Sequence, residues 1–173
     1  MTDTSAPRAV ERAIPPALMV RVGNPVLTWL LSGRRRSAKV GQDLLILHVT
    51  GRRTGRVYST PVSYQRQPDG RLLVLTSSTW RVNLRGRPTP VEHTLLGERI
   101  PATAELEERP AVVAEVYERL IEKFGLARAG RRLGIRINLD RAPTRDELAE
   151  ASRREHLSVV HLDLAGHAPR DTA

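Results

Sequence analysis

The sequence of 173 residues contains no cysteine and few aromatic side chains. Without cysteine, the chain can form no disulfide and has no thiolate for catalysis or metal binding. The aromatic side chains are Trp29, Tyr58, Tyr64, Trp80, Tyr117 and Phe124. These are too few for the row of stacking rings that binds single-stranded nucleic acid. Because no helix-turn-helix or zinc-finger pattern is present either, no specific nucleic-acid binding is expected.

Long apolar runs are also missing. The first apolar stretch, AIPPALMV, is interrupted by two prolines and followed by Arg21, so it does not resemble a secretory signal. The stretch NPVLTWLL is far shorter than a membrane span. The sequence therefore predicts a cytoplasmic protein. Residues 24–39, with one tryptophan and three consecutive arginines, leave open a peripheral contact with an anionic membrane. The alternative is a short helix over 25–32 that covers a barrel mouth.

Lysine is nearly absent as well, since the 28 basic side chains include only Lys39 and Lys123. The net charge is +9, and its excess lies entirely in the first part of the chain. Residues 1–100 hold 16 basic and 6 acidic side chains, whereas residues 101–173 hold 12 and 13. This asymmetry indicates an anionic partner for the first part.

The apolar pattern predicts six strands, over residues 43–50, 57–66, 71–78, 90–96, 99–106 and 156–164. Pro61 indicates that the second strand has an open edge or a bulge. Helices are expected at 79–86 with Thr79 as cap, from Pro110 to Phe124, and at 145–154. Thr144 and Glu147 form a capping-box pattern before the last of these. The sequence thus predicts an α+β fold, and closure of the sheet into a barrel would hide its edges.

We expect one domain over residues 17–164, between flexible tails at 1–16 and 165–173 that are rich in alanine, proline and charge. The side chains predicted to point into the barrel are Leu45, Leu47, Val62, Leu73, Leu75 and Val159.

The stretch TGRRTG, residues 50–55, carries more glycine and arginine than a hairpin turn needs. Arg52, Arg53 and Arg56 could converge on one phosphate or carboxylate, because forked guanidinium groups match such anions. Inward-pointing backbone amides and the hydroxyl groups of Thr50 and Thr54 would complete this cradle. The alternative is a solvated basic hairpin.

Other chemistry has less support in the sequence. No metal site is expected from the five histidines, His48, His93, His156, His161 and His167, because the carboxylates show no ligand spacing. His156 and His161 would also face opposite ways on one strand. Serine hydrolysis lacks a G-x-S-x-G or comparable nucleophile turn.

The segment from Leu44 to Pro88 resembles the deazaflavin (coenzyme F420)-dependent nitroreductase family. The shared features are a strand, TGRRTG, a strand with a central proline, a D-G turn, a strand ending in serine, and W-x-x-N-L-R. The resemblance implies a split β-barrel of the FMN-binding type, with about six antiparallel strands and flanking helices. Proteins of this fold often pair their sheets, so a homodimer is a further expectation.

The resemblance also implies a function and a site. The function is hydride transfer from reduced coenzyme F420 to a small lipophilic acceptor, a quinone or nitro compound. The alternative is a non-catalytic protein of the same fold that binds flavin (FMN), haem or an anionic lipid. Tyr58, Ser63 and Tyr64 are alternative proton donors. The cofactor-binding residues would be Arg52, Arg53, Thr54, Gly55, Arg56, Thr60, Pro61, Ser63, Thr76, Ser77, Ser78 and Trp80.

Overall fold

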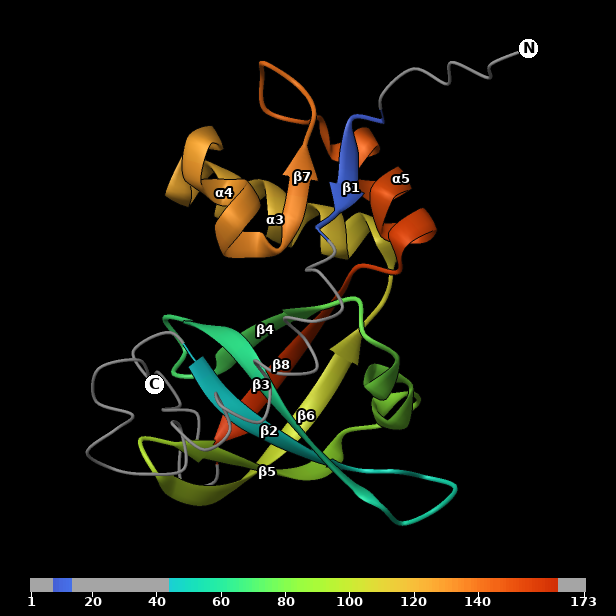
Figure 1. Cartoon of the computed structure of the whole chain (residues 1–173), viewed down its shortest axis with the longest axis vertical. Helices are drawn as coiled ribbons and strands as arrows, with labels where there is room; N and C mark the ends of the chain where they lie inside the picture. Colours follow the sequence, from blue (N-terminus) through green and yellow to red (C-terminus); the bar gives the residue numbers. More distant parts are fainter. Residues whose placement is uncertain (1–7, 14–43, 165–173) are drawn as a thin grey trace, which may run out of the picture. The chain divides into compact units, whose positions relative to one another are not determined.

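The computed structural model describes residues 8–13 and 44–164 (Figure 1). The chain divides into two compact units. One, the barrel unit, has its described residues at 44–106 and 160–164, and the other, the helical unit, has them at 8–13 and 107–159. The expected helix at 25–32, the membrane-contact segment 24–39 and the C-terminal tail lie outside the described residues. One domain over 17–164 stays a prediction.

Six antiparallel strands close into a barrel, as the sequence predicts. They are Leu44–Thr50 (β2), Val57–Arg66 (β3), Leu72–Thr76 (β4), Thr89–Leu95 (β5), Glu98–Glu107 (β6) and Ser158–Leu164 (β8), in the order β2-β3-β4-β8-β6-β5. The hairpin of β2 and β3 pairs Leu44 with Ser63 and Thr50 with Val57. Its connecting loop projects from the barrel (Figure 1). A 3₁₀ helix at Thr79–Leu84 (η1) follows β4.

The barrel interior is filled by alternate apolar residues of the strands. Leu45, Leu47 and Val62 point inward as predicted. The prediction was wrong for the third and last strands, where Leu72, Val74, Val160 and Leu162 belong to the core and Leu73, Leu75 and Val159 do not. Leu73 and Val159 are nonetheless fully buried. Because these strands carry apolar residues on both faces, their sequence pattern could not show which face points inward.

Pro61 lies opposite Ile46 in the β2–β3 pair. On its other side, β3 pairs with β4 only through Tyr64, Gln65 and Arg66. The proline therefore lies where β3 has no second strand partner, an edge position of the kind that proline tolerates. The expected open edge at Pro61 is confirmed.

The helical unit contains Pro110–Phe124 (α3), Leu126–Leu133 (α4) and Arg145–Glu155 (α5). Short strands Val10–Arg12 (β1) and Ile135–Ile137 (β7) pair antiparallel in the same unit. The sequence analysis missed α4, β1 and β7 and assigned β1 to a flexible tail. Three-residue strands carry too little pattern to be recognised. Val10 is nevertheless buried, and its carbonyl oxygen accepts a hydrogen bond from Arg154.

Two helix starts that looked alike in sequence differ in the structure. The capping box of α5 is present, because Thr144 Oγ1 accepts from the Glu147 amide and the Glu147 carboxylate accepts from the Thr144 amide. Thr79, in contrast, is the first residue of η1 and not its cap, which was predicted wrongly. At the other end of α5, His156 follows the last helical residue and has φ +56°. The predicted strand start at residue 156 was therefore too early, because β8 begins at Ser158.

We expect Thr144→Ala to lower the free energy of unfolding by about 1 kcal/mol, the usual value of a threonine N-cap. The measurement is a urea titration followed by circular dichroism. Thr79→Ala is the matched control: Thr79 stands at a helix start but is exposed and caps nothing, so its replacement should change stability by less than about 0.5 kcal/mol. Equal losses in the two variants would contradict the assignment of the cap.

Candidate functional site

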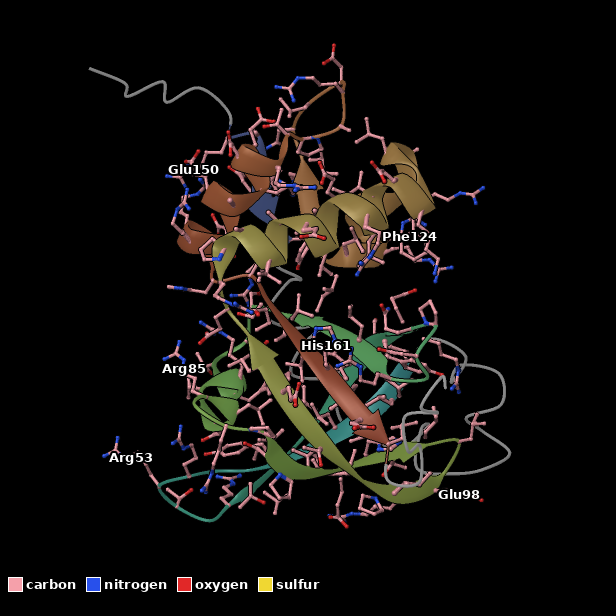
Figure 2. The ribbon with its side chains drawn as sticks, turned by 180° about the vertical axis from the view of Figure 1, so that it is seen from behind. Arg53, Arg85, Glu98, Phe124, Glu150 and His161 are labelled. Carbon is pink, nitrogen blue, oxygen red and sulfur yellow. The ribbon has the colours of Figure 1, made fainter. Side chains whose placement is uncertain are left out.

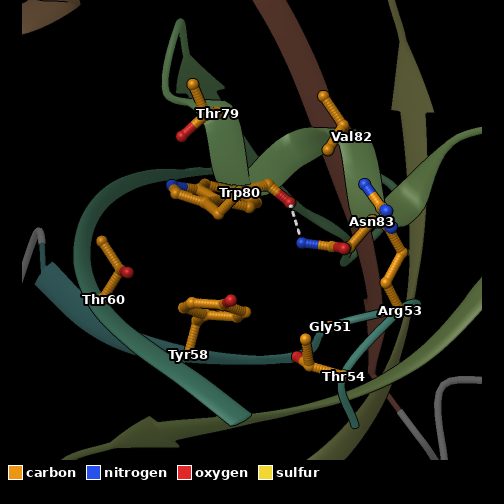
Figure 3. A pocket seen from close by; sticks show the side chains of 9 residues that line it. All are labelled: Gly51, Arg53, Thr54, Tyr58, Thr60, Thr79, Trp80, Val82 and Asn83. Carbon is orange, nitrogen blue, oxygen red and sulfur yellow. Dashed lines mark hydrogen bonds between the residues drawn. The ribbon is translucent and has the colours of Figure 1, made fainter. Parts of the chain in front are cut away.

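A pocket of about 690 Å³ lies between the β2–β3 loop, the first half of β3 and η1 (Figure 3). It is lined by Gly51, Arg53, Thr54, Tyr58, Thr60, Thr79, Trp80, Val82 and Asn83. Two aromatic rings, three threonine hydroxyl groups and one amide surround the space, and none of the described residues that line it is acidic. This combination suits a flat conjugated ligand that carries polar or anionic groups.

The loop at residues 51–56 is closed by its own hydrogen bonds. The Gly51 amide donates to Arg56 O at 2.7 Å, and the Gly55 amide donates to Gly51 O at 2.9 Å. The Arg56 amide donates to Thr54 Oγ1 at 3.3 Å. Gly55 has φ +66°, which glycine adopts without strain. Because these three amides already have acceptors within the loop, they are not free to bind an anion as the predicted cradle requires.

Gly51 allows the Tyr58 ring to lie directly against the loop. A Cβ atom at this position would stand 2.9 Å from a Tyr58 ring carbon, 3.1 Å from Thr54 Oγ1 and 3.2 Å from Arg56 O. The Arg56 guanidinium lies 5.8 Å from the centre of the same ring. The Tyr58 ring therefore contacts the loop on one side, while 40% of the residue is exposed.

Arg52 and Asn83 connect the loop to η1. The Asn83 side chain accepts from the Arg52 amide at 3.1 Å and donates to Trp80 O at 3.0 Å (Figure 3). Arg52 Nη1 donates to Arg85 O at 3.0 Å. Both residues thus hold the two sides of the pocket at a fixed separation. The i, i+3 spacing of Trp80 and Asn83 was a usable sequence signal for this pair, because it fits a single helical turn.

Of the three arginines expected to converge on one anion, only Arg53 lines the pocket. Arg52 is bound to the end of η1, and Arg56 lies over Tyr58. The predicted convergence was therefore wrong. The Arg53 side chain projects from the loop tip (Figure 2) and has no hydrogen bond or ion pair with another described residue. It is available to an anionic group at the pocket rim.

The remaining predicted site residues fall into two groups, those that line the pocket and those that do not. Thr60 and Trp80 line the pocket, as does Thr54. Pro61 and Ser63 do not line it; Pro61 follows Thr60 on the strand, so it points to the opposite face. Thr76, Ser77 and Ser78 lie before η1 and do not line the pocket either: the Ser78 amide donates to Thr76 Oγ1, and the carbonyl oxygens of Ser77 and Ser78 accept from Arg81. Tyr58, expected only as an alternative proton donor, also lines the pocket, and Thr79, Val82 and Asn83 are pocket residues absent from the predicted cofactor-binding set.

The described histidines lie apart from this pocket. On the outward face of the barrel, His48 contacts Ser59 Oγ and Thr94 Oγ1, each at 2.8 Å. Burial and the charge of Arg99 lower the pKa of His48, and Glu92 opposes part of this shift. His93 is opposite Leu47 in the strand pair and is completely buried. Among the described residues, no three His, Asp or Glu side chains gather in a way that could hold a metal ion.

Residues 31–134 match the family model of the F420H(2)-dependent quinone reductases. The chain belongs to this family. The resemblance to deazaflavin-dependent reductases is thereby confirmed, and the family name specifies quinone reduction. Membership supports an F420-dependent oxidoreductase and gives no support to FMN or haem.

Other comparisons add little to the F420H(2)-dependent quinone reductase assignment. A solved structure titled as a domain-swapped dimer is 13% identical, covers 86% of this chain and 100% of its own, and has a TM-score of 0.43. That likeness is too weak to argue from, and the homodimer stays a prediction. No curated protein matches the chain. None of the helices in the described ranges is long and apolar enough to cross a membrane.

Proposed function

We propose that this protein is an F420H2-dependent oxidoreductase that passes a hydride from the reduced deazaflavin to a quinone. Family membership together with the pocket between the β2–β3 loop and η1 carries this proposal. The bound cofactor supplies the hydride, so the protein has to bind, orient and exclude water. This explains why no nucleophile or paired-carboxylate motif is needed.

The residues of the pocket fit a deazaflavin with an anionic tail. Tyr58 and Trp80 offer aromatic surfaces for the ring, while Thr54, Thr60 and Asn83 offer hydrogen-bonding groups for its carbonyl and polyol oxygens. Arg53, exposed at the rim, would pair with phosphate or carboxylate groups of the tail. The absence of any acidic side chain from the lining avoids repulsion of these anions.

Reduction of a quinone to a quinol requires a proton in addition to the hydride. Of the three hydroxyl groups considered as donors, only that of Tyr58 lines the pocket. Tyr64 belongs to the buried core of the barrel, and Ser63 lies outside the pocket lining. A phenol is a far stronger acid than the threonine hydroxyls around it. We therefore assign proton donation to Tyr58.

We expect Arg53→Ala to weaken binding of coenzyme F420 by about 1.5–3 kcal/mol, the range for a hydrogen bond to a charged group. This corresponds to about a 10- to 150-fold rise in Kd. Arg53→Lys should recover only part of the affinity, because lysine keeps the charge and loses the fork. Binding is measured by cofactor fluorescence, with FMN and haem titrated in parallel. The affinity should fall as salt rises.

Arg66→Ala is the matched control, because it removes one exposed positive charge from the far end of β3, six residues beyond the pocket residue Thr60 and about 20 Å along the strand. It should leave the Kd within about twofold of the wild type, since surface charges beyond a Debye length are screened. Equal Kd values for the wild type and Arg53→Ala at low salt would show that the loop arginines form only a solvated turn. No saturable binding of the deazaflavin at all would refute the proposed function and favour a non-catalytic binding protein.

A further inference from the structure

Two aromatic rings stand on opposite sides of the pocket. The indole of Trp80 comes from η1 and the phenol ring of Tyr58 from β3, and Figure 3 shows the open space between their faces. Tyr58 is one of the few large apolar side chains in the described ranges that remain strongly exposed, at 40%. An exposed ring with a defined position, facing a second ring, has no evident role in folding.

The positions of both rings are set by neighbouring residues and not by contact with each other. Tyr58 lies against the loop at Gly51 with the Arg56 guanidinium over its ring, and Trp80 packs against the apolar core of the barrel. Asn83 holds η1, which carries Trp80, to the backbone of Arg52. Arg52 adds a second bond from the loop to the end of η1. Arg52 and Asn83 therefore join the loop beside Tyr58 to the helix that carries Trp80.

We propose that Tyr58 and Trp80 clamp one flat, electron-poor, carbonyl-bearing ring system, and that Arg52 and Asn83 are the positioning residues that set the width of this aromatic slot. The inference rests on the proposed function, which it deepens by assigning the ring-binding residues. Aromatic rings carry negative charge on their faces, so two of them favour an electron-poor ring between them. Thr54, Thr60 and Thr79 line the same pocket, so their hydroxyl groups are available as donors to its carbonyl oxygens.

Two ring systems have this chemistry: the deazaflavin of the cofactor and the ring of the quinone. The full-length Trp29→Phe protein separates them, because the sequence has only two tryptophans and Trp80 then reports alone. Trp80 fluorescence is titrated with coenzyme F420 and, separately, with 2-methyl-1,4-naphthoquinone. The protein has no cysteine, so the naphthoquinone cannot attach to a thiol. Saturable quenching by a ligand identifies it as an occupant of the slot, and at least one of the two should quench.

In the same background, Tyr58→Leu should raise the Kd of the quenching ligand on the order of 5- to 100-fold, as expected for the loss of one stacking ring. Tyr58→Phe should keep the Kd within about twofold, because it keeps the ring and loses only the hydroxyl group. Asn83→Ala should raise the Kd while the melting temperature stays close to that of its control. That control is Asn138→Ala, which removes a side-chain hydrogen bond to the Arg8 carbonyl in the helical unit.

Unchanged affinity in Tyr58→Leu, or the absence of quenching by both ligands, would overturn the aromatic slot. Since Tyr58 is exposed, this variant tests the proposal even if Asn83→Ala does not fold. The proposed function can fail separately from the aromatic slot. If a ligand quenches Trp80 fluorescence but the protein does not reduce quinone with F420H2, the slot stands and the oxidoreductase is refuted. If the wild-type protein reduces quinone with F420H2 and Tyr58→Leu leaves the Kd of the ligand unchanged, the proposed function stands and the aromatic slot is refuted.

Discussion

Leu47→Ala should lower the free energy of unfolding by about 2–5 kcal/mol, the largest effect that we expect from a single substitution in the barrel. Leu47 is completely buried and belongs to the apolar core of the barrel. Truncation removes three methyl or methylene groups and leaves a cavity that the surrounding strands cannot close. The measurement is a guanidinium chloride titration of the full-length protein.

Leu96→Ala is the control for the loss of the same atoms at the surface. Leu96 is 46% exposed in the β5–β6 turn, so little apolar area returns to water. Its replacement should change the free energy of unfolding by about 0.5 kcal/mol or less. A change of less than about half a kcal/mol for Leu47→Ala would place Leu47 outside the barrel core.

His93→Leu should raise the free energy of unfolding by about 1–3 kcal/mol at neutral pH, the usual cost of an unsatisfied buried polar group. His93 is completely buried between Val91 and Leu95 on the inward face of β5. Neither of its ring nitrogens has a hydrogen-bond partner among the described residues. Leucine is similar in volume and needs no partner. Thermal and chemical unfolding at pH 7.5 measure the difference.

The same substitution should reduce the loss of stability in acid. Burial lowers the pKa of His93, with a smaller contribution from His48, and the backbone of Ile100 opposes part of the shift. The unfolded chain therefore takes up this proton at a higher pH than the folded chain does. The contribution of neutral His93 to the free energy of unfolding is therefore fully present above pH 6.5, the ordinary pKa of histidine. It is lost as the pH drops below this value.

The free energy of unfolding of His93→Leu should still fall somewhat in acid, because the pKa of His48 is also lowered in the folded protein. His156→Asn is the control, since it removes an exposed histidine and asparagine tolerates the left-handed conformation at this position. Its unfolding free energy should follow that of the wild type between pH 7.5 and 5. If His93→Leu shows the same slope as the wild type, His93 does not stay neutral in the folded barrel.

Much of the fold could be predicted because local patterns decide it. The bounds of β2 and β3, the Asp69-Gly70 turn, the hairpin of β5 and β6 and the start of α3 at Pro110 all agree with the sequence-based expectations. So does the capping box at Thr144. Each depends on a few neighbouring residues whose conformations are set by turn, capping or alternation rules.

The six antiparallel strands, the excess of basic residues in positions 1–100 and the place of the TGRRTG loop follow from local sequence. Which residues meet around the pocket depends on the folded chain. The roles of Arg52 and Arg53 could not be told apart in sequence, because Arg52 binds the carbonyl oxygen of Arg85, just after η1 and 33 residues away. Tyr58 faces Trp80 for the same reason: strand alternation fixes the face of Tyr58, but closure of the barrel brings η1 opposite it. Contacts between distant segments depend on the whole fold, whereas turns and caps depend on adjacent residues.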